Sequence, residues 1–309
     1  MWSLLAGFRP LNLGIMLATQ ILLLGALLGF DASFVRFLGN GQLLAYLAST
    51  LLVAAAGYVW NDLADRATDA INRPDRRTLP RALGAKRATE VAAALAGVGF
   101  GVALGANVDV GPVPYELVYI GVGWALYFYA YRWKCTVLLG NLVVSLLCGL
   151  LVVTTYFAAL EILPTADPER LGWWFIFLPY AAFAFALTLL RELVKDLEDL
   201  PGDTAAGCAT LPVRFGVAPT RHLIGAYALM LLLVFLVVAG GAFWWEGSPF
   251  RKGFFFLLGL ITFIQAEILF RFYFARNPEN LRTVSNRIKG MMLLGLVALY
   301  FLRGSTLFS

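Results

Sequence analysis

The sequence of 309 residues is 60% hydrophobic and 14% charged, and its mean hydropathy is +0.77. A water-soluble globule of this size needs more polar surface than this composition supplies, so the sequence indicates a membrane protein. The net charge of +5 does not imply binding to nucleic acid, because most basic residues follow the loop pattern of a membrane protein described below.

Uncharged runs recur along the whole chain, and most of them reach the roughly 20 residues that a bilayer-spanning helix needs. Six runs are long: Pro10–Phe30, Leu38–Asn61, Val91–Val108, Thr136–Leu160, Leu171–Leu190 and Leu223–Trp245. Three shorter runs are flanked by charge and can span with tilt: Leu117–Tyr131, Gly253–Phe270 and Ile288–Leu302. The sequence therefore predicts an all-α membrane protein with nine transmembrane helices, with eight as the fallback, in one transmembrane domain over residues 1–309.

Basic residues are concentrated on one side of this predicted topology. If nine helices alternate across the bilayer, 19 of the 24 Lys and Arg residues lie on the side of the N-terminus. Lys and Arg accumulate in cytoplasmic loops. We therefore expect an integral protein of the cell (inner) membrane whose N-terminus and active-site loops face the cytoplasm.

Two loop features carry further expectations. The cysteines at 135, 148 and 208 form no CxxC pair, so the sequence predicts neither a disulfide framework nor a metal cluster. The basic segment from Arg276 to Lys289 contains Pro278, and we expect it to be an inner-face loop that touches anionic membrane lipids.

Two acidic motifs of identical spacing follow the second and sixth predicted helices. Both read D-x-x-D-x-x-x-D, and a constant offset of 134 residues separates them. Their members are Asp62, Asp65 and Asp69 in the first motif and Asp196, Asp199 and Asp203 in the second. Positions i, i+3 and i+7 share one side of a helix, so each motif predicts a stripe of carboxylates, although Pro201-Gly202 is expected to end the second helix before its last aspartate. Four helices separate the two sites, which predicts two pseudo-repeated four-helix units around a central cavity.

The carboxylates of these motifs are candidate metal ligands. Six such groups at one membrane face repel one another unless cations lie among them, and hard oxygen ligands suit Mg²⁺. The predicted metal-binding residues are Asn61, Asp62, Asp65, Asp69, Asp196, Asp199 and Asp203.

Basic residues near the same motifs can hold phosphate oxygens that the metal leaves free. They are Arg66, Arg73, Arg76, Arg77, Arg191 and Lys195. A site that combines carboxylates, metal and surrounding cations is typical of diphosphate binding. The main alternative from another class is an ion-coupled transporter, since paired repeats and carboxylates also occur in carriers. The acids cluster at one membrane face instead of the midplane, which favours an enzyme.

The extended motifs resemble the two signatures of the UbiA superfamily of intramembrane prenyltransferases. The first signature continues through Asn72-Arg73-Pro74-x-Arg76, and the second begins at Lys195 and continues to Thr210-Leu211-Pro212. The segments Arg9-Pro10-x-Asn12 and Tyr131-x-x-Lys134 through Gly140-Asn141 are also similar to the family. A departure is Thr78-Leu79-Pro80-Arg81, where many relatives have Arg-Pro-Leu, so the contacts of this loop do not follow from the resemblance.

The resemblance implies a prenyl diphosphate that is bound through Mg²⁺ between the two motifs, with its tail in a lateral apolar chamber. Ionisation at C1 would yield an allylic carbocation, which a lipid or aromatic acceptor captures. The catalytic residues under this interpretation are Asp65, Asp199 and Lys195. The substrate-binding residues are Arg9, Asn12, Arg66, Arg73, Arg76, Lys134, Asn141 and Arg191.

The acceptor follows from finer features of the second motif. The run from Arg191-Glu192 to Gly202-Asp203 looks most like members that prenylate geranylgeranylglyceryl phosphate in ether-lipid synthesis. The alternative is an aromatic acceptor of the quinone, tocopherol or chlorophyll type. Because the loops supply more cations than one diphosphate requires, we expect a second anionic group on the acceptor. Its candidate contacts are Arg9, Arg73, Arg76 and Lys134, and the alternative is that these residues only follow the positive-inside rule.

Overall fold

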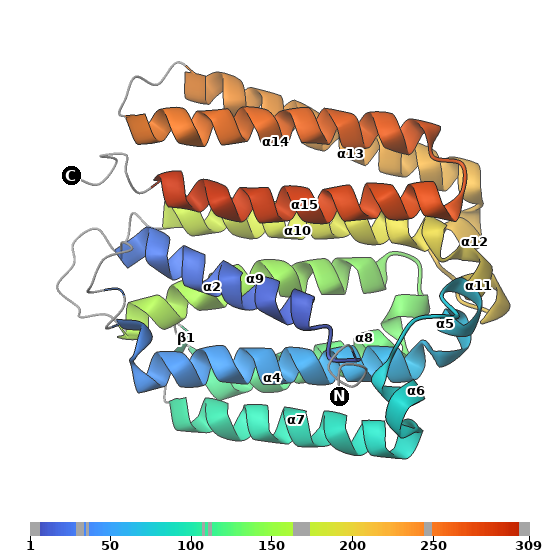
Figure 1. Ribbon diagram of the computed structural model, residues 1–309, viewed down its shortest axis with the longest axis horizontal. Coiled ribbons are helices and arrows are strands. Elements are labelled where there is room, and N and C mark those ends of the chain that lie inside the picture. Colours follow the sequence, from blue (N-terminus) through green and yellow to red (C-terminus); the bar gives the residue numbers. More distant parts are fainter. Residues whose placement is uncertain are drawn as a thin grey trace.

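The computed structural model describes residues 7–28, 34, 37–106, 109–110, 113–162, 174–243 and 249–302. Long helices lie side by side and account for most of this part of the chain (Figure 1). They are α2 (Pro10–Leu28), α4 (Gly41–Ala64), α7 (Ala85–Ala106), α8 (Tyr115–Tyr131), α9 (Leu139–Ile162), α10 (Trp174–Glu198), α13 (Val217–Phe243), α14 (Pro249–Phe274) and α15 (Pro278–Leu302). The predicted span ends at Phe30, Val108, Leu171 and Trp245 lie outside the described residues.

The prediction of an all-α membrane protein is confirmed. Within the described ranges, eight helices are long and apolar enough to cross a bilayer, in agreement with the fallback number. The helix α8 has 17 residues, which is shorter than the other long helices, so a ninth span stays a prediction. A short antiparallel ribbon, β1 (Asp109–Val110) with β2 (Val113–Pro114), precedes α8 and pairs Asp109 with Pro114.

Four short helices lie together at one end of the bundle (Figure 1). They are α5 (Arg66–Asn72), α6 (Leu79–Leu83), α11 (Leu200–Ala205) and α12 (Leu211–Phe215). The first pair links α4 to α7 and the second pair links α10 to α13, so the same order of elements occurs twice. The duplication of whole four-helix units stays a prediction.

A local sequence repeat explains why α6 and α12 match. Thr78-Leu79-Pro80 and Thr210-Leu211-Pro212 each begin a five-residue helix with proline in its first turn, where the missing N–H costs nothing. Gly84 and Gly216 end these helices with φ of 83° and 88°, a conformation that glycine adopts without strain. The loop at Thr78, which departs from the family pattern, therefore has the same form as its counterpart in the second half.

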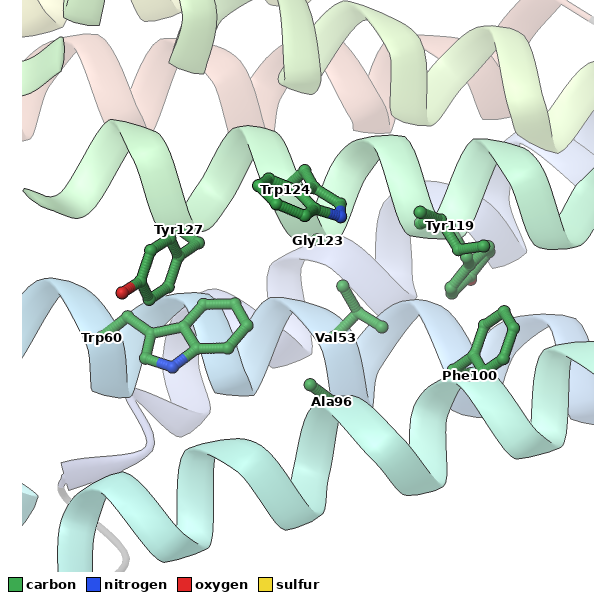
Figure 2. Close-up of a pocket in the computed structure, with 9 residues that line it drawn as sticks. Val53, Trp60, Ala96, Phe100, Tyr119, Gly123, Trp124 and Tyr127 are labelled. Atoms are coloured by element: carbon green, nitrogen blue, oxygen red, sulfur yellow. The ribbon is translucent and has the colours of Figure 1, made fainter. Parts of the chain in front are cut away.

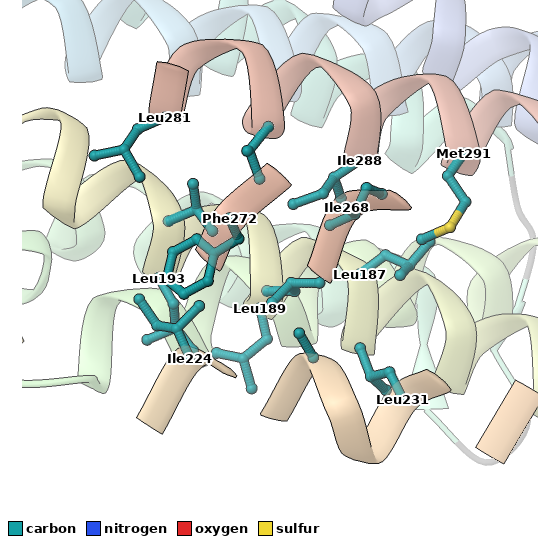
Figure 3. Close-up of a cluster of buried hydrophobic side chains, with 14 of the residues drawn as sticks. Leu187, Leu189, Leu193, Ile224, Leu231, Ile268, Phe272, Leu281, Ile288 and Met291 are labelled. Carbon is teal, nitrogen blue, oxygen red and sulfur yellow. The ribbon is translucent and has the colours of Figure 1, made fainter. Parts of the chain in front are cut away.

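The largest buried apolar cluster joins α10, α13, α14 and α15 (Figure 3). On α15 its members are Leu281, Val284, Ile288 and Met291, which recur every three or four residues and so form one helix face. This face packs along α10 and α14 and holds α15 beside the motif-bearing helix.

The prediction that residues 276–289 form an inner-face loop is wrong. The helix α15 begins at Pro278, ten residues before the predicted span. Proline at a helix start is favoured, and the apolar face described above stabilises the first turns by burial. The basic residues of this segment from Arg282 to Lys289 therefore project from a helix that packs against α10.

The prediction that the cysteines form no disulfide is also wrong, because Cys135 and Cys208 are bonded. Cys135 ends η1 (Trp133–Cys135), and Cys208 lies between α11 and α12. The backbone N–H of Ala209 donates to the carbonyl of Cys135 at 2.8 Å, which brings the two loops together. The partners are 73 residues apart, so sequence spacing gave no signal for the pairing.

Candidate active site

The middle aspartate of each motif lies at a junction between a long and a short helix. Asp65 separates α4 from α5, and Asp199 separates α10 from α11. Backbone hydrogen bonds continue through both junctions. The N–H of Asp69 donates to the backbone carbonyl of Asp65 at 2.7 Å, and the N–H of Asp203 donates to that of Asp199 at 3.0 Å. The helix α10 ends at Glu198, before Asp203 as predicted, and the chain becomes helical again in α11, whose first turn tolerates Pro201.

The carboxylates of the first motif are buried among cations. Asp62 accepts from Arg9 and, at 3.0 Å, from Arg76, which also holds Asp69 at 2.8 Å. Asp65 accepts from Lys134, on the loop after α8, and from the Asn61 amide at 2.6 Å. Arg9, the motif itself, Arg76 and Lys134 are thus joined here from four separate parts of the chain.

The second motif has fewer cationic partners. Asp199 accepts from Arg73 at 2.7 Å and lies 3.9 Å from Lys195. Asp196 accepts from the buried Asn141 amide at 2.9 Å, and Asp203 accepts from the Thr210 hydroxyl at 3.2 Å. Arg73 lies in the loop that follows the first motif, so its ion pair with Asp199 joins the two motifs.

Asn72 fixes the two motifs against each other. Its amide Nδ2 donates to the carbonyl of Asp199 at 3.0 Å, and its Oδ1 accepts from the N–H of Gly202 at 2.9 Å. Glycine is required at this contact, because a Cβ at position 202 would lie 2.4 Å from Asn72 Nδ2. One side chain of α5 therefore sets the position of α11.

We expect Gly202→Ala to lower turnover about tenfold or more, since the added methyl must displace Asn72 and break both hydrogen bonds, and small misplacements of catalytic groups are costly. The measurement is turnover together with the melting temperature. Gly97→Ala on α7 is the matched control, because its Cβ would meet nothing within 4 Å. Wild-type turnover in Gly202→Ala would show that the bridge does not position the site.

The balance of charge differs between the motifs. Burial opposes ionisation of Asp65, but Lys134, Lys195 and Arg9 outweigh it and hold the pKa of that carboxyl below its usual range. Burial raises the pKa of Asp199 against the opposing charges of Lys195 and Arg73. Burial, and next the charge of Asp199, raise the pKa of Asp203 to about 6. The second motif thus holds carboxylate charge that the protein compensates incompletely.

This donor set fits a divalent cation with oxygen ligands. The charge of Asp65 acts on both Asp199 and Asp203, so carboxylates of the two motifs face one shared region. Mg²⁺ takes a few carboxylates and completes its shell with water and phosphate oxygens. Across the described ranges, no group of three acidic, His or Cys side chains already forms a metal cage. Cations occupy the carboxylates instead, so metal ligation requires Arg73, Arg76 or Lys134 to turn away.

Most predicted site residues are brought together, with two exceptions. Arg66 on α5 and Arg77 in the loop after it are exposed and make no ion pair in the described ranges, so they do not reach the cluster. Asn12 lies at the start of α2, three residues after Arg9, whose guanidinium lies 5.0 Å from the Tyr58 ring centroid.

Sequence reasoning missed four groups at the site. They are Asn72, Glu192, Glu198 and Lys289. Spacing could have indicated Glu192, which lies one turn before Asp196 on the same helix face. Glu198 accepts from Arg73 at 3.1 Å and from Arg282 at 3.0 Å. No sequence signal places Lys289 beside α10, because that contact depends on the packing of α15.

A separate cavity of about 380 Å³ lies between α4, α7 and α8 (Figure 2). Val53, Trp60, Phe100, Tyr119 and Tyr127 are among its lining residues. Trp60 and Asp62 are two positions apart on α4, which places them about 200° apart around the helix. The cavity therefore opens on the opposite face of α4 from the motif carboxylates, and the predicted apolar chamber beside the site stays a prediction.

Comparison with known proteins agrees with this arrangement. A model described as the UbiA prenyltransferase family matches residues 21–285. A digeranylgeranylglyceryl phosphate synthase of Methanospirillum hungatei is 32% identical over 222 residues, which cover 71% of this chain and 70% of the relative. A synthase of the same name from Korarchaeum cryptofilum is 30% identical and covers 90% of each chain. The chain therefore belongs to the UbiA prenyltransferase family and is a prenyltransferase.

Solved structures share the fold. A structure described as digeranylgeranylglyceryl phosphate synthase in membranes matches with a TM-score of 0.61 at 19% identity and covers 96% of each chain. A UbiA homolog from Archaeoglobus fulgidus bound to GPP and Mg²⁺ has a TM-score of 0.57 at 16% identity and covers 96% of this chain and 99% of its own. At these identities the likeness concerns the fold alone.

Proposed function

We propose that this member of the UbiA prenyltransferase family transfers a prenyl group from a prenyl diphosphate to geranylgeranylglyceryl phosphate in a Mg²⁺-dependent reaction. The observation that carries the proposal is the joining of two aspartate motifs into one site by Asn72 and Arg73. The curated relatives named as digeranylgeranylglyceryl phosphate synthases support the acceptor. The homolog bound to GPP and Mg²⁺ supports the metal.

The metal site proposed for this chain lies between Asp65 and Asp199, with Asn61, Asp62, Asp69, Asp196 and Asp203 as the other candidate ligands. Bound Mg²⁺ would supply positive charge to the departing diphosphate, where charge develops as the C–O bond breaks. The cations Arg73, Arg76 and Lys134, which now neutralise the carboxylates, then become available to phosphate oxygens. The same side chains would thus neutralise the carboxylates of the empty site and contact phosphate oxygens in the loaded site.

Burial protects the reactive carbon in this scheme. Asp62 and Asp69 are 2% and 5% exposed, whereas Asp65 and Asp199 are partly buried, so much of the carboxylate cluster is shielded from water. An allylic cation formed there meets little water, which suppresses hydrolysis in favour of the acceptor. Lys195, 3.9 Å from Asp199, adds a cation on the membrane side of the motif.

The orientation is also proposed. The positive-inside rule puts the end with α5, α6, α11 and α12 in the cytoplasm and the protein in the cell membrane.

The acceptor is tested by offering purified protein in nanodiscs a panel of acceptors with prenyl diphosphates of several lengths. The panel contains geranylgeranylglyceryl phosphate, 4-hydroxybenzoate, homogentisate and an uncharged phenol. We expect mass spectrometry to detect one dominant product, the diether of the glyceryl phosphate, because the site offers cations for a second anion.

Other outcomes have equally definite meanings. Selective prenylation of homogentisate or 4-hydroxybenzoate would replace the ether-lipid proposal by the aromatic alternative. Preference for the uncharged phenol would refute the second anion. Uptake of substrate into vesicles without any product would indicate a carrier.

A further inference from the structure

The helices α10 and α15 run antiparallel, and one ion pair sets their register. Arg282 donates to Glu198 at 3.0 Å at the motif end of the bundle. Lys289 follows Arg282 by seven residues, and Arg191 precedes Glu198 by seven. Seven residues are about 10.5 Å of helix, so Arg191 and Lys289 lie at the same depth, two turns below the motif end.

These two cations surround one carboxylate. Glu192 accepts from Arg191 and lies 3.8 Å from Lys195. Lys289 and Arg9 are also close enough for their charges to act on Glu192. Lys195 is shared with Asp199 and Arg9 with Asp62, but Lys289 makes no ion pair within 4.0 Å in the part of the chain that the structure describes. At this level Lys289 is therefore a cation without a paired carboxylate in the described ranges.

Two guanidinium nitrogens here lack partners as well. The Nε atoms of Arg191 and Arg9 are buried and make no hydrogen bond to any residue that the structure describes. Unsatisfied charged donors are costly in a membrane interior and are retained mainly where they serve a function. An anion between these groups would neutralise Lys289 and accept hydrogen bonds from the Nε atoms of Arg191 and Arg9.

We propose that Arg191, Lys289 and Arg9 bind the anionic group of the acceptor, a phosphomonoester, whereas Arg73, Arg76 and Lys134 serve the diphosphate. The inference rests on the proposed function and reassigns the acceptor contacts. The second set of cations is already engaged with the motif carboxylates, where the metal and the diphosphate belong. Arg9 also pairs with Asp62 at the motif level, whereas Arg191 and Lys289 lie two turns below the motif end.

The transfer reaction requires the acceptor phosphate to lie below the diphosphate. The acceptor hydroxyl oxygen forms a bond to C1 as the bond from C1 to the diphosphate oxygen breaks, and diphosphate and the hydroxyl proton are released. Only a few bonds separate the phosphate of a glyceryl phosphate from its free hydroxyl. A phosphate fixed below the motifs therefore places that hydroxyl next to C1 while its alkyl chain remains in lipid.

The experiment compares hexadecylglyceryl phosphate with hexadecylglycerol, which lacks the phosphate, as probes of the full-length protein. Dissociation constants are measured by calorimetry in detergent for wild type, Arg191→Met and Lys289→Met. Methionine keeps much of the side-chain volume but removes the charge. Arg287→Met is the matched control, because Arg287 lies on the same helix and faces Glu267 at 3.8 Å. Binding of geranyl thiodiphosphate with Mg²⁺ reports whether each variant is folded.

We expect wild type to bind the phosphate probe at least about tenfold more tightly than hexadecylglycerol. Arg191→Met and Lys289→Met each remove most of this preference, Lys289→Arg and Arg287→Met retain it, and Lys289→Met and Arg287→Met bind geranyl thiodiphosphate like wild type. A preference that survives in both methionine variants would overturn the inference while leaving the proposed function intact. Absence of any preference in wild type would overturn both. A phosphate preference without diether product in the acceptor panel would overturn only the proposed function.

Discussion

Replacement of Asp65 or Asp199 by alanine is expected to lower turnover at least about a hundredfold, which corresponds to about 3 kcal/mol of lost transition-state stabilisation. Each residue lies at the helix junction of its motif, where it faces the other motif and binds a cation that the diphosphate is expected to use. Steady-state kinetics with a saturating prenyl diphosphate measures the effect.

Asp75→Ala is the matched control for this prediction. Asp75 lies in the same loop as Arg73 and Arg76, but it is exposed and makes no ion pair in the described ranges. Its removal is expected to change turnover less than twofold or so, in keeping with a surface position. Full activity in either motif variant, or equal loss in Asp75→Ala, would contradict the assignment of the site, provided that melting temperatures show folded protein.

Removal of divalent cations is expected to abolish product formation entirely. The carboxylates of the second motif are incompletely compensated by the protein, with a pKa of about 6 for Asp203, so a diphosphate cannot bind beside them without added positive charge. The measurement is product formation after treatment with EDTA, followed by addition of Mg²⁺ or Mn²⁺.

Recovery of activity after metal is added back would show that EDTA removed the metal and did not unfold the protein. Activity should return in full with Mg²⁺ or Mn²⁺, whereas Ca²⁺ prefers more ligands at longer distances and should restore less. Product formation that persists in excess EDTA would show that Arg73, Arg76 and Lys134 alone neutralise the leaving group. The metal assignment would then be abandoned.

The motif end of the site could be predicted from the sequence, because the spacing of the motif aspartates is a local feature. The D-x-x-D-x-x-x-D pattern is read within one helix and its short continuation, so Asp65 and Asp199 could be located without knowledge of packing. The matched spacing and the predicted topology also placed both motifs at the same membrane face. The cross-connection by Asn72 was not predictable, since it depends on the close approach of α5 to Gly202.

The less successful predictions concern contacts between distant segments. The composition of residues 276–289, with Pro278 and four basic residues, predicts a loop and conceals the apolar face that Leu281, Val284 and Ile288 form. The helical structure of this segment comes from burial against α10 and α14, a tertiary effect that overrides local composition. Lys289 and the disulfide partner of Cys135 were missed for the same reason.

The claim that both motifs form one metal and diphosphate site is tested most directly by Mn²⁺ binding, followed by electron paramagnetic resonance with geranyl thiodiphosphate present. We expect wild type and Asp75→Ala to bind Mn²⁺ much more tightly with the analogue than without it. Asp65→Ala and Asp199→Ala should each lose this enhancement, although they come from different halves of the chain. Enhancement of wild-type size in either of these two variants would contradict a site shared by the two motifs.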